Sequence, residues 1–219
     1  MTAQKFAALF DMDGVLIDSV IYHWQAMNEV LADYGLNVPD KDLRKYVGQP
    51  LYRQVKQLSD VFGVVLDYDE FNQRTTARKL ELLEHIEPKE GVLTLLELLK
   101  SNGIPMAVAT SNTRTETDRR LEAVGIRSYF SAVITEDDVS EHKPEPAVYI
   151  AAAEAVKTLP NSCVVFEDAP AGIESARRAG MKSIAVRTPY TTTEDLGNAN
   201  ALVSSLADVS IELMTGLLK

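Results

Sequence analysis

The sequence has very little cysteine and no long hydrophobic run. Cys163 is the only cysteine among 219 residues, which excludes a disulfide framework and a zinc centre built on several cysteines. No apolar run approaches the roughly 18 residues of a membrane-spanning helix, and the run from Phe6 to Phe10 ends at Asp11. We therefore expect neither a membrane span nor a signal peptide.

Basic residues are fewer than acidic ones. The chain has 22 Lys and Arg against 32 Asp and Glu, for a formal net charge of −10. A nucleic-acid-binding protein normally presents a basic face, so this balance argues against a nucleic-acid partner. The length corresponds to about one and a half average domains, which suits one domain with an insertion. We expect a cytoplasmic globular protein, and the net negative charge favours a monomer.

Several familiar catalytic patterns are missing. The sequence has no Gly-x-Ser-x-Gly elbow and no Gly-x-Gly-x-x-Gly loop after a strand. The three histidines, His23, His85 and His142, have no metal-ligand spacing among themselves. Serine hydrolase, dinucleotide-binding and histidine-based zinc chemistry are therefore set aside.

Five short apolar runs are each followed by a turn signal and a helical pattern. They lie at Lys5–Phe10, Ile104–Ala109, Ala132–Ile134, Cys163–Phe166 and Lys182–Val186. Their apolar residues are consecutive rather than alternating, which is typical of strands buried on both faces of a parallel sheet. The pattern predicts βαβ units and hence an α/β fold, a Rossmann-like parallel sheet flanked by helices.

The helices between these runs have recognisable ends. The expected helices run from Val92 to a stop at Gly103, from a capping box at Thr113 and Glu116 to Gly125, from Pro146 to about Val156, and through Ile173 to Gly180.

Residues 18–86 interrupt this alternation and contain no convincing strand. Three amphipathic helices are expected there: one through Val20, Trp24, Met27 and Leu31, one through Leu51, Val55, Leu58 and Phe62, and one capped by Asp69 that carries Leu80, Leu83 and Ile86. We predict an α/β core domain of residues 1–17 and 87–219. The inserted helical domain, 18–86, would follow the first strand, a position that suits a lid.

Polar residues follow four of the predicted strands. They are Asp11 and Asp13, then Thr110, Ser111 and Asn112, then Lys143 in a loop, and finally Glu167 and Asp168. In open α/β sheets, ligands bind outside the carboxyl ends of the strands, so these groups should converge. Close carboxylates repel each other by about 4 kcal/mol per pair at an effective dielectric constant near 20. A hard cation such as Mg²⁺, together with Lys143, would offset that repulsion.

Such a site suits an anion, and phosphate fits best. A carboxylate can attack phosphorus and form an aspartyl-phosphate intermediate. A divalent metal ion would bridge this nucleophile and a phosphoryl oxygen. A second carboxyl two residues along the chain can protonate the leaving oxygen and later deprotonate the attacking water.

The sequence resembles the haloacid dehalogenase-like superfamily over nearly its whole length. The segment from Phe10 to Ser19 (FDMDGVLIDS) is similar to the family's first motif. Thr110, the Lys143-Pro144 pair and the segment from Phe166 to Ile173 (FEDAPAGI) match the second, third and fourth motifs in order and approximate spacing. The nearest subgroup contains β-phosphoglucomutases and small-molecule phosphatases with an α-helical cap.

This resemblance implies a role for each motif residue. Asp11 would be the nucleophile and Asp13 the general acid/base, while Thr110 and Lys143 hold the phosphoryl group. The metal ligands would be Asp11, Asp13 through its carbonyl, Asp168 and Glu167. Glu167 can also act without contacting the metal, by holding the residues that do. Gly14, Ser111 and Asn112 are candidate substrate-binding residues, with Asn112 alternatively a helix cap.

Two further candidates lie in the insert. A lone histidine such as His23 is usually a helix-surface or core residue, but β-phosphoglucomutases have a similar Tyr-His pair that helps bind substrate. They also have an arginine three residues after a glycine in the cap. Counting from Gly48, a candidate substrate-binding residue, places Leu51 there instead, with Arg53 two residues further. Because that arginine holds the second phosphate of a bisphosphate, its absence disfavours a mutase.

The preferred hypothesis is a Mg²⁺-dependent phosphatase that hydrolyses a small phosphorylated metabolite, with sugar phosphates as the leading class. The alternative is a β-phosphoglucomutase-like isomerase that transfers phosphate within a sugar phosphate. A catalytically silent phosphate-binding module is a third possibility, which the pair of acids Asp11 and Asp13 argues against.

Overall fold

The computed structural model describes residues 6–39, 42, 51–83, 86–189 and 191–219, and the chain divides into two compact units. The larger unit combines Met1–Asp18 with Glu87–Lys219, and the smaller unit is Ser19–Ile86. The chain thus passes from the larger unit to the smaller one after Asp18, one residue later than the expected boundary after residue 17.

The segments of the larger unit that precede and follow the insert are hydrogen-bonded to each other. Ile17 and Pro88 form an isolated antiparallel β-bridge. The backbone amide of Lys89 also donates a hydrogen bond of 2.9 Å to the carbonyl of Leu16. The smaller unit is therefore inserted between two chain positions that are neighbours in space.

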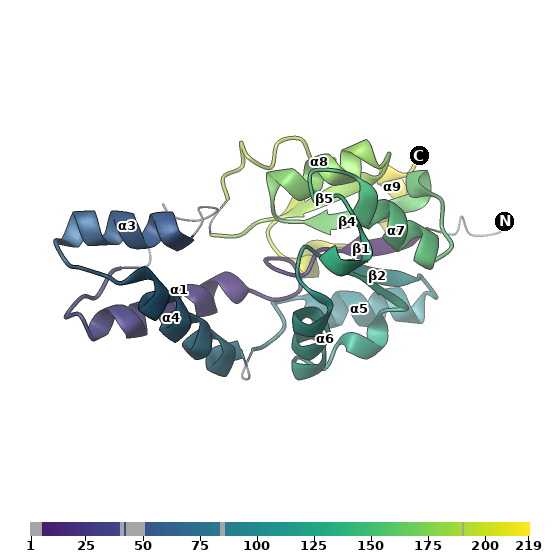
Figure 1. The fold of residues 1–219 in the computed structure, drawn as a ribbon. Coiled ribbons are helices and arrows are strands. Elements are labelled where there is room, and N and C mark those ends of the chain that lie inside the picture. The colour runs from purple at the N-terminus through teal and green to yellow at the C-terminus, as the bar shows by residue number, and fades with distance from the viewer. Residues whose placement is uncertain (1–5, 40–41, 43–50, 84–85, 190) are drawn as a thin grey trace. The chain divides into compact units, whose positions relative to one another are not determined.

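A six-stranded parallel sheet forms the centre of the larger unit (Figure 1). Its strands are β1 (Ala7–Phe10), β2 (Met106–Ala109), β3 (Ala132–Ile134), β4 (Cys163–Glu167), β5 (Lys182–Val186) and β6 (Ala201–Val203). Neighbouring strands pair in parallel in the order β3-β2-β1-β4-β5-β6. This order confirms the predicted α/β fold with a Rossmann-like sheet.

Four helices lie close to their predicted places between the strands. They are α5 (Val92–Ser101), α6 (Arg114–Ala123), α7 (Ala147–Ala155) and α8 (Pro170–Arg178), and a further helix, α9 (Ile211–Leu217), follows the last strand. Single-turn 3-10 helices lie at Arg127–Tyr129, Glu136–Asp138, Pro160–Ser162 and Leu206–Asp208. Thr113 caps α6 as predicted, because its side chain accepts a hydrogen bond from the Glu116 amide. None of the helices in the described ranges is long and apolar enough to cross a membrane.

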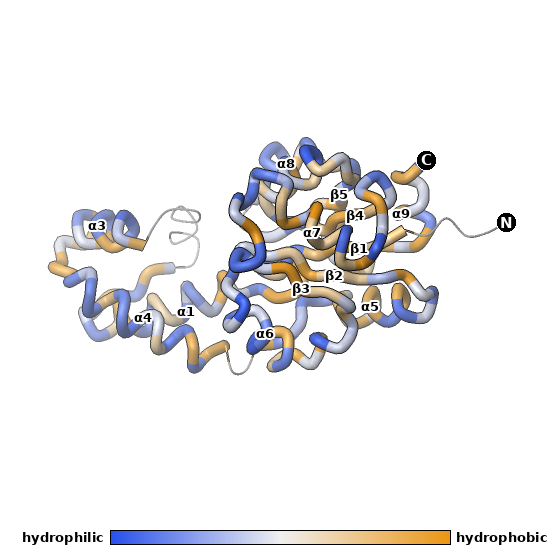
Figure 2. Tube along the Cα trace, turned by 45° about the vertical axis from the view of Figure 1, so that its right-hand side comes forward, coloured by the Kyte–Doolittle hydropathy of each residue, from blue (hydrophilic) through white to orange (hydrophobic). Residues whose placement is uncertain are grey.

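Every residue of the central strands β1, β2 and β4 is buried, as their consecutive apolar residues predict. Figure 2 shows hydrophobic residues along the strands of the larger unit. Leu9, Ala107 and Val165 pack in one cluster with residues of α7 and α8. Alternate side chains of a strand point to the other face, where the rings of Phe10 and Phe166 stack with centroids 4.7 Å apart. Both phenylalanines have no exposed surface. Packing on two sides therefore holds β1 and β4 firmly.

Several details of the larger unit differ from the prediction. The first strand begins at Ala7 rather than at Lys5. The short strand β6 and the C-terminal helix α9 lie outside the predicted set of elements. The second strand begins at Met106 rather than Ile104, since Pro105 lacks an amide proton for the strand ladder. The fourth strand extends one residue beyond the predicted end, so that Glu167 belongs to the strand.

The smaller unit is helical throughout its described regular elements. They are α1 (Ser19–Ala32), α3 (Leu51–Phe62) and α4 (Tyr68–Leu82). Trp24, Met27 and Leu31 are buried on α1, and Val55 and Leu58 are buried on α3. These residues follow the predicted helical spacing and form the apolar stripes by which the helices pack.

The prediction that Asp69 caps the third of these helices is wrong. Asp67 is the N-cap residue, and its side chain accepts a hydrogen bond of 2.9 Å from the Glu70 amide. Asp69 lies within the first turn, where a negative charge interacts favourably with the helix dipole. The helix ends at Leu82, so Ile86 lies beyond it.

Candidate active site

The order of the strands brings two acidic segments together. β1 and β4 are neighbours at the point where the strand order reverses, and Phe10 is paired with Phe166. The Asp11 amide donates to the Phe166 carbonyl at 3.0 Å. Asp11 and Glu167 therefore occupy adjacent strand ends, which is the position where open α/β sheets bind ligands.

Lys143 joins these two carboxylates. Its Nζ lies 2.5 Å from Asp11 Oδ1 and 2.7 Å from Glu167 Oε1, and it also donates to the Ala109 carbonyl at 3.1 Å. The three partners use all three ammonium protons. The side chain of Lys143 is 9% exposed. The structure thus brings Lys143 to Asp11 across 132 residues of chain, as the sequence predicts.

Glu167 uses both of its carboxylate oxygens within the protein. Oε1 accepts from Lys143 and, at 2.7 Å, from the hydroxyl of Tyr149, while Oε2 accepts from the amides of Asp168 and Ala169 at 3.0 and 3.2 Å. A carboxylate offers about four lone-pair positions. These contacts account for them, so Glu167 is held against Lys143 by donors of the protein itself.

The acidic groups form a cluster of oxygen donors. One carboxylate oxygen from each of Asp11, Glu167 and Asp168 lies within 4.8 Å of the others. Burial, opposed by Lys143 and reinforced by Glu167, raises the pKa of Asp11 to about 7. Burial together with repulsion from Glu167 and Asp11 raises the pKa of Asp168 to about 8. An all-oxygen donor set with uncompensated negative charge fits a hard divalent cation.

The charge of Lys143 is stabilised by the same cluster. Burial alone lowers the pKa of Lys143, but the carboxylates of Asp11 and Glu167 outweigh burial and raise it above its ordinary value. Burial, together with the negative charge of Glu167, also raises the pKa of the Tyr149 hydroxyl well above its usual range. Tyr149 therefore remains a hydrogen-bond donor to Glu167 at neutral pH.

Two glycines leave space for these carboxylates. Gly14 has φ +78°, and a Cβ atom there would lie 2.0 Å from Asp168 Oδ2. A Cβ atom at Gly172, on α8, would lie 1.7 Å from Glu167 Oε1. Gly14 therefore allows Asp168 to approach the loop after β1, and Gly172 allows Glu167 to lie against α8. The carbonyl of Gly14 also accepts a hydrogen bond from Lys89.

Asp13 lies beside the segment that follows β2. Its carboxylate accepts hydrogen bonds from Asn112 Nδ2 and, at 3.3 Å, from Arg120 Nη1. Asn112 Nδ2 also lies 2.8 Å from the Thr110 hydroxyl, and Ser111 is exposed. The structure thus brings Asn112 to Asp13, while the role of α6 cap belongs to Thr113.

The candidates in the insert are described only within the smaller unit. His23 lies on α1, with its ring centroid 5.0 Å from that of Trp24. Burial and the positive charge of Lys79, opposed by a hydrogen bond with Gln54, lower the pKa of His23 to about 4. Gly48 lies outside the described residues. A role of either residue at Asp11 therefore stays a prediction.

Four residues that lie against predicted site residues have no predicted site role themselves: Lys89, Arg120, Tyr149 and Gly172. Gly172 belongs to the FEDAPAGI segment, so its position was visible in the sequence. Arg120 and Tyr149 lie on helices at ordinary spacing, and nothing in the residue pattern separates them from surface or core residues. Lys89 lies just after the chain returns to the larger unit. Its contact with Gly14 follows from the neighbouring β-bridge between Ile17 and Pro88, which no local pattern reveals.

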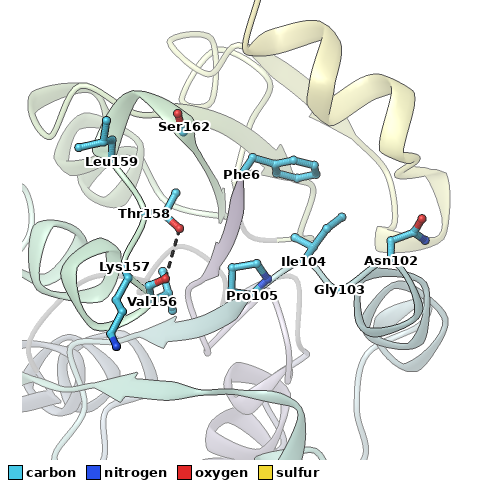
Figure 3. A pocket seen from close by; sticks show the side chains of 10 residues that line it. All are labelled: Phe6, Asn102, Gly103, Ile104, Pro105, Val156, Lys157, Thr158, Leu159 and Ser162. Carbon is cyan, nitrogen blue, oxygen red and sulfur yellow. Dashed lines mark hydrogen bonds between the residues drawn. The ribbon is translucent and has the colours of Figure 1, made fainter. Parts of the chain in front are cut away.

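A separate cavity lies at the opposite ends of the strands (Figure 3). It has a volume of about 600 Å³ and is lined by residues that precede β1, β2 and β4, including Phe6, Ile104, Pro105 and Ser162. Its lining includes none of the carboxylates described above. We therefore assign the chemistry to the acidic cluster and not to this cavity.

Comparison with known proteins agrees with this geometry. The family model of haloacid dehalogenase-like hydrolases matches residues 8–186, and the chain belongs to that family of enzymes. The chain is 36% identical to the fructose-1-phosphate phosphatase YqaB of Escherichia coli over 188 residues, which cover 84% of this chain and 98% of that protein. It is 30% identical to the phosphorylated carbohydrates phosphatase of Thermotoga maritima, covering 91% of this chain and 90% of that protein.

A solved structure shows the same fold. The crystal structure of a HAD family hydrolase from Deinococcus radiodurans, with bound phosphate and sodium, superposes with a TM-score of 0.87 at 25% identity. The match covers 98% of this chain and 97% of that chain.

Replacing Gly172 by alanine should destabilise the protein. In Gly172→Ala the new methyl group overlaps Glu167 Oε1, so the carboxylate must move away from Lys143 and Tyr149. We expect the free energy of unfolding, measured by urea denaturation, to fall by about 1–3 kcal/mol. Gly216→Ala on α9 is the control, since a Cβ atom there meets nothing within 4 Å. Equal stability of the two variants would contradict this account.

The lowered pKa of His23 predicts a pH dependence. In the unfolded chain His23 takes up a proton near its ordinary pKa of 6.5, whereas in the folded protein it does so only near 4. The unfolded state binds more protons in this interval, so stability is lost as the pH falls from 6.5 to 4. We expect His23→Gln to lose less unfolding free energy than the wild type between those pH values. The control is His142→Gln, at an exposed position, which should lose as much unfolding free energy as the wild type. The same loss of unfolding free energy in His23→Gln as in the wild type would refute the prediction.

Proposed function

We propose that this protein is a Mg²⁺-dependent phosphatase that hydrolyses a small phosphorylated metabolite, most suitably a sugar phosphate, through an aspartyl-phosphate intermediate. The observation that carries the proposal is the contact of Lys143 with Asp11 inside a buried carboxylate cluster at adjacent strand ends. The names of the Escherichia coli and Thermotoga maritima relatives support a sugar phosphate. The phosphate in the Deinococcus radiodurans structure supports a phosphoryl site.

The oxygen donors suit a single magnesium ion. We assign Asp11, Asp168 and the backbone carbonyl of Asp13 as its ligands, and Glu167 as the group that holds Lys143. When bound, the ion would offset the negative charges of the carboxylates and of the phosphoryl group. The raised pKa of Asp168, to about 8, follows from burial near other negative charges, and a divalent cation beside it favours the ionised form.

The chain's own residues then carry out two displacements. The carboxylate of Asp11 attacks phosphorus, and the bond to the leaving oxygen breaks as Asp13 gives that oxygen a proton. Asp13, now ionised, takes a proton from water, which attacks the aspartyl phosphate and releases inorganic phosphate. Lys143 and the hydroxyl of Thr110 hold phosphoryl oxygens, and Glu167 keeps Lys143 in place and charged.

In this proposal residues 18–86 are a cap domain, and residues 1–17 and 87–219 are the catalytic core. His23 and Gly48 in the cap, with Gly14, Ser111 and Asn112 in the core, would contact the substrate. Exclusion of water by such a domain favours phosphoryl transfer over side reactions. A cytoplasmic monomer remains our expectation for the whole protein.

A mutase is the competing function for the same site. Leu51 stands where the resemblance to β-phosphoglucomutases implies an arginine for the second phosphate, and Arg53 bonds to the hydroxyl of Tyr52 at 3.1 Å. With β-glucose 1-phosphate and a catalytic amount of glucose 1,6-bisphosphate, we expect free phosphate as the product. Accumulation of glucose 6-phosphate without phosphate release would assign the mutase instead.

Phosphate release from a panel of sugar phosphates, fructose 1-phosphate among them, tests the proposed function directly. We expect turnover with Mg²⁺, loss of turnover with EDTA, and recovery when Mg²⁺ is added back. Asp11→Asn removes the nucleophile and should lower kcat by at least about 1000-fold. Glu122→Gln, an exposed carboxylate on α6, is the control and should keep wild-type activity. Undiminished phosphate release by Asp11→Asn would overturn the mechanism.

A further inference from the structure

Arg120 places a buried positive charge against Asp13. It lies on α6, and its side chain is 7% exposed, compared with 29% for Asp13. Nη1 lies 3.3 Å from Asp13 Oδ1, and Nη2 lies 3.3 Å from Glu116 Oε1. A guanidinium that is removed from water in this way needs anionic partners, and these two carboxylates supply them.

The helix itself directs the guanidinium toward Asp13. Glu116 and Arg120 are four residues apart, a spacing that places their side chains on the same face of a helix. Glu116 is in turn fixed by Thr113, the N-cap residue of α6, whose hydroxyl donates to Glu116 Oε2 at 3.3 Å. The line of contacts from Thr113 through Glu116 to Arg120 therefore limits the positions that the guanidinium can occupy.

Arg120 and Asn112 hold different oxygens of the same carboxylate. Arg120 contacts Oδ1 of Asp13, and Asn112 donates to Oδ2 and also contacts the Thr110 hydroxyl. Two donors on two oxygens fix both the position and the plane of the carboxyl group. The donors differ in chemistry, because the amide is neutral and the guanidinium carries a positive charge.

We propose that Arg120 is the positioning residue for Asp13 during proton transfer to the leaving oxygen, an inference that rests on the proposed phosphatase function. Asp13 must hand its proton to the leaving oxygen and later recover one from water. Arg120 exchanges no proton in either step. It holds Oδ1, which fixes the orientation in which Oδ2, beside Asn112, faces the substrate.

The value of this orientation depends on the leaving group. The alkoxide of a sugar phosphate is strongly basic and leaves only if it is protonated as the bond breaks. A p-nitrophenolate is weakly basic and leaves without a proton. Loss of Arg120 should therefore impair hydrolysis of a sugar phosphate much more than hydrolysis of p-nitrophenyl phosphate. A purely structural loss would impair both substrates equally.

The experiment compares Arg120→Met with Arg119→Met, a change at the adjacent exposed residue of α6. We measure kcat/KM for fructose 1-phosphate and for p-nitrophenyl phosphate, because kcat/KM covers the steps through the first phosphoryl transfer. For Arg120→Met we expect a fall of about 10- to 100-fold on the sugar phosphate, which is part of the roughly 100- to 10,000-fold that general acid catalysis supplies, and of less than about threefold on the aryl ester. Arg119→Met should leave both unchanged. Equal losses on the two substrates in Arg120→Met would overturn the inference.

Two further variants make the result decisive. Arg120→Lys keeps the charge and should recover part of the activity on fructose 1-phosphate; a variant no better than Arg120→Met would count against a charged positioning residue. If Arg120→Met does not fold, Glu116→Gln replaces it, because it weakens the contact that holds the guanidinium and lies at a half-exposed position. An unchanged ratio of kcat/KM for fructose 1-phosphate to kcat/KM for p-nitrophenyl phosphate in Glu116→Gln then refutes the inference. Failure of the wild type to hydrolyse any sugar phosphate would instead refute the proposed function.

Discussion

The contact between Lys143 and the two buried carboxylates is the interaction on which the site depends. Without it, Asp11 and Glu167 would face each other across neighbouring strands with no positive charge between them. With it, Glu167 is held by four hydrogen bonds, and Lys143 keeps its charge despite burial. Contacts within the protein therefore hold Glu167 and Lys143 in place beside Asp11 and Asp168.

The sheet provides the frame for this arrangement. Phe10 and Phe166 stack across β1 and β4, and the residues that follow them are Asp11 and Glu167. Close packing leaves those strand ends little freedom, so the carboxylates that follow them stay near each other. Gly14 and Gly172 also contribute to this arrangement. Asp168 and Glu167 occupy the space that a Cβ atom would take at each position.

Sequence reasoning gave the fold and the residues on the strand ends for clear physical reasons. Consecutive apolar residues identify buried strands, and parallel strands end at one edge, so Asp11, Lys143 and Asp168 could be expected together. Arg120 and Tyr149 could not be found in this way, because their contacts depend on where a helix packs rather than on a local pattern. The cap of α4 was misplaced for a related reason: Asp67 and Asp69 are equally suitable residues, and only backbone geometry distinguishes them.

The bridge between Ile17 and Pro88 has a consequence for how this protein can change over time. Because the two ends of the insert are already neighbours, the entropy lost when the connection between them closes on folding depends only weakly on the length of that connection. Residues 19–86 are thus an exchangeable module. Recombination could replace them with helices of another size while the phosphorus chemistry is inherited unaltered.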